Sequence, residues 1–202
     1  KLGVNAFIAT MATQNIIKGF AYLMTNGYTI IFDTKLNFLG NGDAFGVPNM
    51  VIFMIVIVIL GDILLNKTAF GKRVLAVGGN AKAARMSGIA VFMIKACCYA
   101  LCSALCVLSG ILNAFNLPVA DTAAGTGNEL EFMAAVVIGG TPMEGGRGSI
   151  RGIIIGAAIM GIIKNAFVML RVSNYWQMVS LGVIILLAVL SHKLRGPKSR
   201  KA

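Results

Sequence analysis

The chain has 202 residues, of which 57% are hydrophobic and only 12% charged, and its net charge at pH 7 is +11. Soluble domains carry about 25% charged residues, so about half of the surface that would cover a soluble core is missing. This composition excludes an ordinary soluble domain and predicts an all-α protein embedded in lipid. The positive charge does not indicate nucleic-acid binding, because the basic residues lie between apolar segments without interleaved aromatic residues.

Five apolar segments approach the length of a membrane-spanning helix, about 20 residues for a hydrocarbon core of about 30 Å. In chain order they are Ala6–Met24, Met50–Leu65, Ile89–Leu112, Ile153–Val172 and Trp176–Ser191. The second and fifth are short and would need flanking residues or local thinning of the bilayer to cross it. The pattern predicts a polytopic membrane helical bundle.

Lysine and arginine are concentrated in two of the connections. Asn66–Gly88 holds five basic residues and no acidic one, and the tail 192–202 holds another five. In contrast, Asn26–Asn49 has one base, Lys35, and Asn113–Asn128 has none. Since basic connections face the cytoplasm, we predict that the basic pair and the C-terminus are cytoplasmic and that the other two connections lie outside.

This orientation requires the chain between Asn128 and Ser173 to enter the membrane and return. The inward arm, Glu129–Pro142, has 14 residues, and at about 21 Å of helix it is too short to cross. We therefore expect a broken, re-entrant element over 129–152 that turns at its Gly-rich loop in the middle of the membrane. Such elements line cavities and mark the substrate path in many transporters.

The residues around this element predict where its helix begins and ends. Asn128 is expected to cap the helix, with Glu131 completing a capping box. Glu129 and Glu131 lie at the positive end of the helix dipole. Gly139-Gly140-Thr141-Pro142 cannot continue a helix and should end it.

Charged residues inside apolar segments are expensive, at about 2.5–3.5 kcal/mol in the bilayer centre. Lys18 in the first span is one such residue, and Lys164 is another. Lys164 lies about twelve residues into its span and should face protein or water rather than lipid. For Lys164 and Asn165 a pathway role and a structural contact are equally supported. The pairs Gly152/Gly156 and Ala157/Gly161 predict close helix packing.

A short capped helix is predicted within the first basic connection. Asn80 precedes Ala81–Ser87 and Gly88, which is the pattern of a helix with a cap at each end. It carries Lys82 and Arg85 on the cytoplasmic side. The two interpretations are contact with anionic lipid and docking of a cytoplasmic partner.

No catalytic or metal site can be assembled from the sequence. The Gly-rich loop lacks the Lys-Ser or Lys-Thr pair of a phosphate-binding loop, so ATP would be bound by another subunit. The lone histidine, His192, has no nucleophile or metal-ligand partner. The cysteines share one apolar helix, where they are expected to pack as small hydrophobes: Cys97, Cys98, Cys102 and Cys106. We predict no enzyme activity, no metal and no cofactor bound by this chain.

Several segments resemble the permease subunits of ribose-type ABC sugar importers. The matching segments are Phe7–Thr10, Thr25–Gly27, Gly78–Asn80, Ala83–Ile89, Ala124–Thr141, Gly145–Ile150, Tyr175–Met178 and Ile184–Val189. Because the similarity runs along nearly all of 1–202, we expect a single permease domain, lacking the first spans of such a permease. Lys164 departs from the family, which usually has asparagine there.

The resemblance implies an ATP-driven importer of a monosaccharide or similar small polar solute in the bacterial inner membrane. The implied partners are a second permease subunit, cytoplasmic ATP-binding cassette subunits, a periplasmic or extracellular solute-binding protein and membrane lipid. The cytoplasmic coupling loop, 66–90, would dock on the ATPase through a set of five residues: Asn80, Ala84, Arg85, Ser87 and Gly88. The translocation pathway would be bordered by a second set: Glu129, Glu131, Gly139, Gly140, Thr141, Lys164 and Asn165.

Three alternatives stay open at this point. A branched-chain amino-acid ABC permease has the same general architecture and differs in the solute. A secondary transporter or channel would work without an ATPase. A membrane structural subunit would carry no solute at all.

Overall fold

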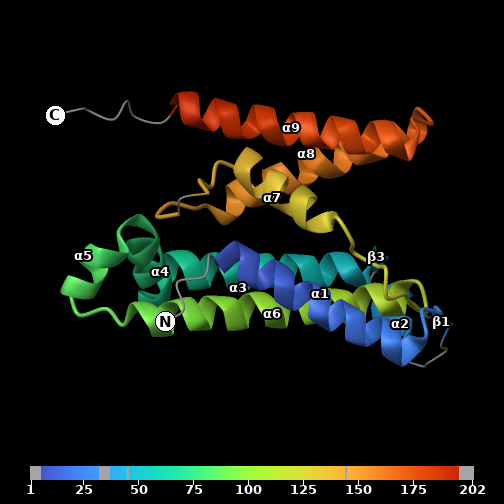
Figure 1. The fold of residues 1–202 in the computed structure, drawn as a ribbon, viewed down its shortest axis with the longest axis horizontal. Helices are drawn as coiled ribbons and strands as arrows, with labels where there is room; N and C mark the ends of the chain where they lie inside the picture. The colour runs from blue at the N-terminus through green and yellow to red at the C-terminus, as the bar shows by residue number, and fades with distance from the viewer. Residues whose placement is uncertain (1–5, 32–36, 45, 144, 196–202) are drawn as a thin grey trace. The chain divides into compact units, whose positions relative to one another are not determined.

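The computed structural model is largely helical and describes residues 6–31, 37–44, 46–143 and 145–195 (Figure 1). The chain divides into two compact units, Lys1–Phe53 with Leu105–Thr126 and Met54–Ala104 with Gly127–Ala202. Lys35 and residues 196–202 of the predicted tail lie outside the described residues, as does the side chain of His192.

Each of the five predicted spans is a helix in the structure. The helices are α1 (Ala6–Thr25), α3 (Asn49–Lys67), α6 (Val91–Asn116), α8 (Ile150–Met169) and α9 (Asn174–Arg195). The second and fifth, predicted to be short, reach 19 and 22 residues because flanking polar residues continue the helix. The last helix therefore includes residues 192–195 of the predicted tail.

Three of these helices, α3, α6 and α8, are long and apolar enough to cross a bilayer, judged over the described residues. No more than 11% of the most apolar stretch in each is buried within the chain. Large side chains such as Ile155 and Ile162 are consequently exposed, and an apolar surface of this extent needs a cover of lipid or protein. The chain is an all-α, multi-pass membrane protein.

Short elements connect the long helices of the first unit. In the described part of that unit they are β1 (Ile30–Ile31), α2 (Asn37–Asn41), β2 (Asp43–Ala44), β3 (Val47–Pro48) and β4 (Val119–Ala120). The first and last strands pair antiparallel, with Ile30 opposite Ala120, and the middle two pair with Asp43 opposite Pro48. The first pairing joins the connection after α1 to the connection after α6.

Two helices follow α3 in the second unit, α4 (Ala69–Gly79) and α5 (Ala81–Met86). Thr68 caps the first of them, because its hydroxyl accepts a hydrogen bond from the Gly71 amide at 3.2 Å. A buried cluster joins α4, α5 and the start of α6, and its members are Val77, Ala84, Val91 and Ile94. Residues 66–90 are thus a packed helical segment rather than an extended loop.

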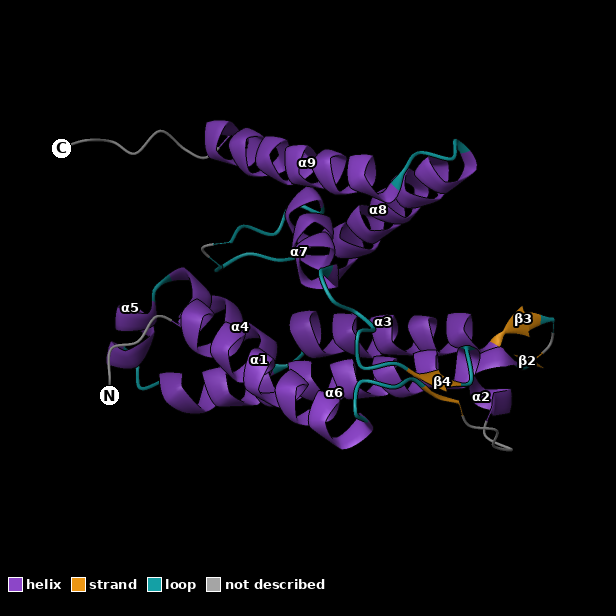
Figure 2. Cartoon of the chain, turned by 45° about the vertical axis from the view of Figure 1, so that its right-hand side comes forward, coloured by secondary structure: helices purple, strands orange, loops and turns teal. Residues whose placement is uncertain are grey.

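A second buried cluster lies where α7 (Asn128–Ile138), α8 and α9 meet (Figure 2). Ala134 and Ala135 of α7 and Met160 of α8 are buried there, and apolar residues of α9 pack against them. At 11 residues, or about 16 Å, α7 is too short to cross a hydrocarbon core of about 30 Å. The predicted inward arm is therefore a short helix held between two long ones.

The start of α7 differs from the prediction. Asn128 is the first helical residue, Gly127 precedes the helix with φ of +86°, and no side chain caps the end. The Asn128 cap was wrong because Gly127 adopts the left-handed conformation, which glycine tolerates, and turns the chain directly into the helix. Glu129 and Glu131 do lie in the first turn, at the positive end of the helix dipole.

Candidate functional site

Asn80 begins α5 as the sequence predicts. Its side-chain Oδ1 accepts hydrogen bonds from the backbone amides of Lys82 and Ala83, both at 3.0 Å. Two of the amides that a helix start leaves without partners are thereby satisfied. The N-terminal cap is confirmed.

Gly88 ends the same helix. It has φ of +80°, its amide donates to the carbonyl of Arg85 at 3.1 Å, and the Ile89 amide donates to the carbonyl of Ala84 at 3.0 Å. This pair of bonds is the Schellman motif, in which glycine supplies the left-handed residue. The Ser87 hydroxyl adds a bond to the Ala83 carbonyl at 3.2 Å, so both ends of this short helix are held.

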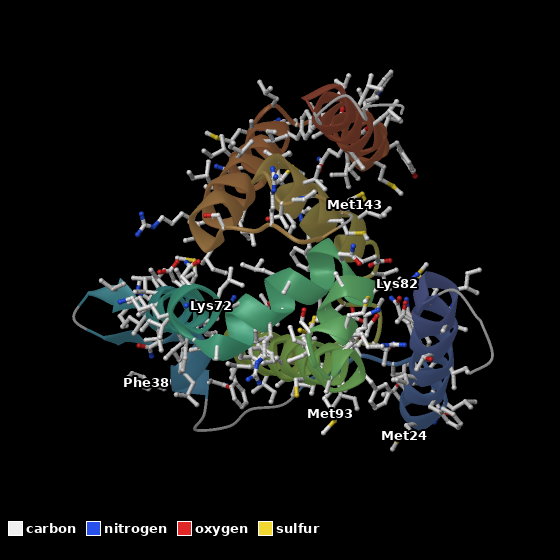
Figure 3. The ribbon with its side chains drawn as sticks, turned by 90° about the vertical axis from the view of Figure 1, so that its left-hand side faces the viewer. Met24, Phe38, Lys72, Lys82, Met93 and Met143 are labelled. Carbon is white, nitrogen blue, oxygen red and sulfur yellow. The ribbon has the colours of Figure 1, made fainter. Side chains whose placement is uncertain are left out.

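The two faces of α5 have different surroundings. Ala84 is only 5% exposed and packs in the cluster with Val77 and Val91, so it holds α5 on its neighbours and is not accessible to a partner. Lys82 (Figure 3) and Arg85 are exposed. Met86, which the sequence did not single out, is 84% exposed. The outward face is therefore basic with one large apolar side chain.

The second candidate region is the antiparallel pair of α7 and α8 (Figure 2). The helices touch through small residues, with Gly139 against Gly152 and Ala135 against Gly156. A Cβ added at Gly152 would overlap the carbonyl oxygen of Gly139, and one added at Gly156 would overlap that of Ala135. The predicted Gly152/Gly156 contact is confirmed, whereas Gly161 has nothing within 4 Å and takes no part in this packing.

Lys164 and Glu131 meet across this helix pair. The Lys164 Nζ lies 2.9 Å from the Glu131 Oε2. The lysine side chain is 57% exposed and the glutamate 19%. Asn165 is exposed beside Lys164, and Glu129 is half-buried in the first turn of α7. The structure thus supplies the structural contact that was one of the two interpretations of Lys164, and leaves the ammonium accessible.

Gly139-Gly140-Thr141 ends α7 as predicted. Gly140 has φ of +83°, and its amide and that of Thr141 donate to the carbonyls of Val137 and Val136 at 3.0 and 3.2 Å. The Thr141 hydroxyl oxygen is buried and has no hydrogen-bond partner among the described residues. An unpaired buried hydroxyl costs about 1–3 kcal/mol, so the Thr141 hydroxyl is a polar group that the described residues leave unsatisfied.

Lys18 of the apolar helix α1, in the first unit, also has a polar partner. Its Nζ donates to the Thr126 hydroxyl at 2.7 Å and lies 5.9 Å from the centre of the Tyr22 ring. Thr126 lies in the turns that lead to α7, and the sequence did not single it out. A threonine beside two glycines carries no periodic signal, so only the tertiary contact identifies it.

The five residues of the predicted docking set lie together on or beside α5, and the predicted pathway set lies on α7, α8 and the turn that ends α7. Among the described residues no three His, Cys, Asp or Glu side chains come together. The described residues therefore offer two candidate sites, the short capped helix α5 and the pair of α7 and α8 with its polar side chains.

Comparison with known proteins decides the family. A protein-family model, described as the permease component of the branched-chain amino acid transport system, matches residues 1–189. The chain belongs to this permease family. A permease component is a transport subunit and not an enzyme.

Relatives of this permease include sugar permeases. It is 41% identical to the ribose import permease protein RbsC of Escherichia coli K12, over 93% of this chain and 60% of the relative. It is also 41% identical to the Bacillus subtilis RbsC, over 91% and 58%. The L-arabinose transport system permease protein AraH of E. coli K12 is 34% identical, over 99% and 61%.

The permease spans about 60% of the length of these relatives. No solved structure matches it. The resemblance to ribose-type ABC permeases, which rested on residues such as Ala83–Ile89 and Ala124–Thr141, is confirmed.

Proposed function

We propose that this chain is part of a permease that imports a monosaccharide or a similar small polar solute into the cytoplasm, driven by ATP hydrolysed on separate subunits. The observation that carries the proposal is the identity with ribose and L-arabinose permeases along more than nine-tenths of the chain. In this proposal the chain itself binds neither ATP nor a cofactor.

The proposed role of α5 is to dock on an ATP-binding cassette subunit. A helix of six residues is unstable alone, and here two caps and the buried Ala84 hold it in place. Arg85, Lys82 and Met86 remain exposed for a partner. Asn80, Ser87 and Gly88 contribute by fixing the helix rather than by contact.

The proposed translocation pathway runs along the pair of α7 and α8. Support comes from three polar groups: the paired Glu131 and Lys164, and the Thr141 hydroxyl, which has no hydrogen-bond partner among the described residues. Polar groups in membrane helices face protein or water rather than lipid. A sugar offers several hydroxyls that could bond to such groups. Gly139 and Gly140 would shape the backbone there, with Glu129 and Asn165 beside them.

The pairing of α7 with α8 leads us to propose another place for the break in the re-entrant element, 129–152, which was expected to turn at its Gly-rich loop in the middle of the membrane. The contacts of Gly139 with Gly152 and of Ala135 with Gly156 set the register of the two helices. In this register the first residue of α7 lies opposite Ile163, six residues before α8 ends at Met169. If α8 crosses the membrane, α7 begins about 9 Å towards the membrane centre from the outer end of α8. We propose that the break in the helix lies on the outer side, at Gly125–Gly127, where solute would enter.

The remaining partners and the orientation follow from the charge pattern and the exposed surface. A second permease subunit and lipid would cover the apolar helices, and a solute-binding protein would deliver the solute from outside. The basic connection 66–90 and the tail 192–202 would face the cytoplasm of a bacterial cell with its inner membrane.

The test is uptake by the assembled transporter. The full-length permease would be reconstituted in liposomes with the ATPase and the solute-binding protein encoded beside it, and uptake of labelled ribose, L-arabinose and leucine measured with and without ATP. We expect uptake of a monosaccharide that needs both ATP and the binding protein. Leucine uptake alone would support the branched-chain amino acid alternative, the solute that the description of the family model names. Uptake that is equal with and without ATP would refute an ATP-driven mechanism.

A further inference from the structure

Two glycine pairs far apart in the sequence touch through their backbones in the second unit. Gly78 and Gly79 are the last two residues of α4, and Gly145 and Gly146 lie in the loop between α7 and α8. In Figure 1 this loop extends towards α4 and α5. The contact joins residues that are 68 positions apart, Gly78 and Gly146.

The contact has no room for a side chain at Gly78 or at Gly146. A Cβ added at Gly78 would lie 2.6 Å from the Gly146 amide nitrogen, and one added at Gly146 would lie 2.6 Å from the Gly79 Cα. Both obstacles are backbone atoms, which cannot rotate away as a flexible side chain can. Gly145 and Gly146 also have φ of +83° and +81°, a conformation that glycine adopts without strain.

Each glycine pair adjoins one of the two candidate regions in the sequence: Gly78 and Gly79 precede α5, and Gly145 and Gly146 precede α8. Gly79 is followed directly by Asn80, the cap of α5. Gly146 is followed, three residues later, by Ser149, the residue that caps α8 with its hydroxyl. The backbones of α8 and of the end of α7 are in turn in contact at Gly152 and Gly139.

We infer that the glycine contact, defined as Gly78, Gly79, Gly145 and Gly146, positions the α7–α8 pair relative to α5 and transmits the displacement of the docking helix to the pathway. This inference rests on the proposed function of α5. Close-packed atoms without intervening side chains transmit a shift directly, because no rotamer change can absorb it. The caps of α5 and the small-residue packing of α7 on α8 make each side move as a unit.

The chain offers a matched pair of substitutions for the test. Gly78→Ala puts a Cβ 2.6 Å from backbone, whereas the Cβ of Gly79→Ala would meet its nearest atom, the Gly146 Cα, at an ordinary 3.7 Å. Both residues lie in the last turn of α4, so the effect on helix propensity is the same. The measurement is solute uptake per ATP hydrolysed, in liposomes containing the full-length permease, its ATPase and its binding protein.

We expect Gly78→Ala to keep the ATPase bound and hydrolysing while uptake per ATP falls about fivefold or more, the usual size of a coupling effect. Gly79→Ala should stay within about twofold of the unmodified protein. A general folding defect would lower hydrolysis and uptake together and leave their ratio unchanged.

A second variant tests the same contact without a clash. Two glycines inserted between Pro142 and Met143 lengthen the loop and add slack without adding a Cβ, so uptake per ATP should fall here too. This variant decides the question if Gly78→Ala fails to assemble. An unchanged ratio in the insertion variant would overturn the inference.

The outcome is separable from that of the proposed function. If the unmodified complex shows ATP-driven uptake and neither variant changes uptake per ATP, the glycine contact is only structural and the proposed function stands. If the unmodified complex takes up no solute with ATP, the proposed function fails and the inference fails with it.

Discussion

Lys164 of α8 and Glu131 of α7 form an ion pair of 2.9 Å across two helices that also touch through small residues and apolar side chains. The pair gives the Lys164 ammonium a carboxylate partner on a neighbouring helix. Because the lysine remains 57% exposed in the isolated chain, it is also available to water or solute. A structural and a transport role can therefore be separated by experiment.

Removing one partner should cost more than removing both. Glu131→Gln leaves Lys164 without its carboxylate, and we expect the melting temperature in detergent to fall by roughly 2–4 °C, as for a loss of about 1 kcal/mol. The double variant Glu131→Gln with Lys164→Asn should recover most of this loss. Thermal unfolding of the four proteins of this cycle gives the coupling. Additive effects would show that the ion pair does not stabilise the helix pair.

Thr141→Val should separate stability from transport. The substitution keeps the shape and removes a buried hydroxyl that has no partner among the described residues, so the melting temperature should stay equal or rise. If the hydroxyl bonds to solute, the KM for uptake should increase by about two- to tenfold. Thr141→Ser, which keeps the hydroxyl, is the matched control. Equal KM values for both variants would exclude Thr141 from the pathway.

Gly156 and Gly161 lie on the same helix, and we expect opposite responses to the same substitution. The Cβ of Gly156→Ala would overlap the carbonyl oxygen of Ala135, whereas that of Gly161→Ala meets nothing within 4 Å. Forcing α7 from α8 should cost about 1–3 kcal/mol, and Gly161→Ala should be neutral or slightly stabilising. Heating followed by size-exclusion chromatography compares the surviving folded fraction of each. Equal survival would contradict the packing of α7 on α8.

Charge reversal on α5 should uncouple transport from ATP hydrolysis. Arg85→Glu places a negative charge on the exposed face of the docking helix, and we expect uptake per ATP to fall by roughly tenfold, because an unfavourable charge contact costs at least about 1.4 kcal/mol. Lys72→Glu makes the same change on α4 (Figure 3), away from α5, and should have little effect. Unchanged uptake in the Arg85 variant would refute the docking role.

Local sequence patterns predicted the parts of this fold that depend on local chemistry. The five apolar segments became helices, and the caps of α5 were confirmed at Asn80 and Gly88. A cap is formed within a few residues of the chain, so the residues that make it are visible together. The Asn128 cap was wrong for a local reason as well, since Gly127 competes for the same position.

The sequence by itself therefore determined that this protein is embedded in lipid, where its long helices lie and how the short helix α5 is capped, because hydrophobic length and capping act over short distances along the chain. Only the tertiary structure decided that Lys164 pairs with Glu131, 33 residues away, and that Gly78 meets Gly146. Those contacts depend on the register between helices. In an apolar bundle many registers bury similar surface, and backbone contact between glycines leaves no side-chain pattern to reveal the one that forms.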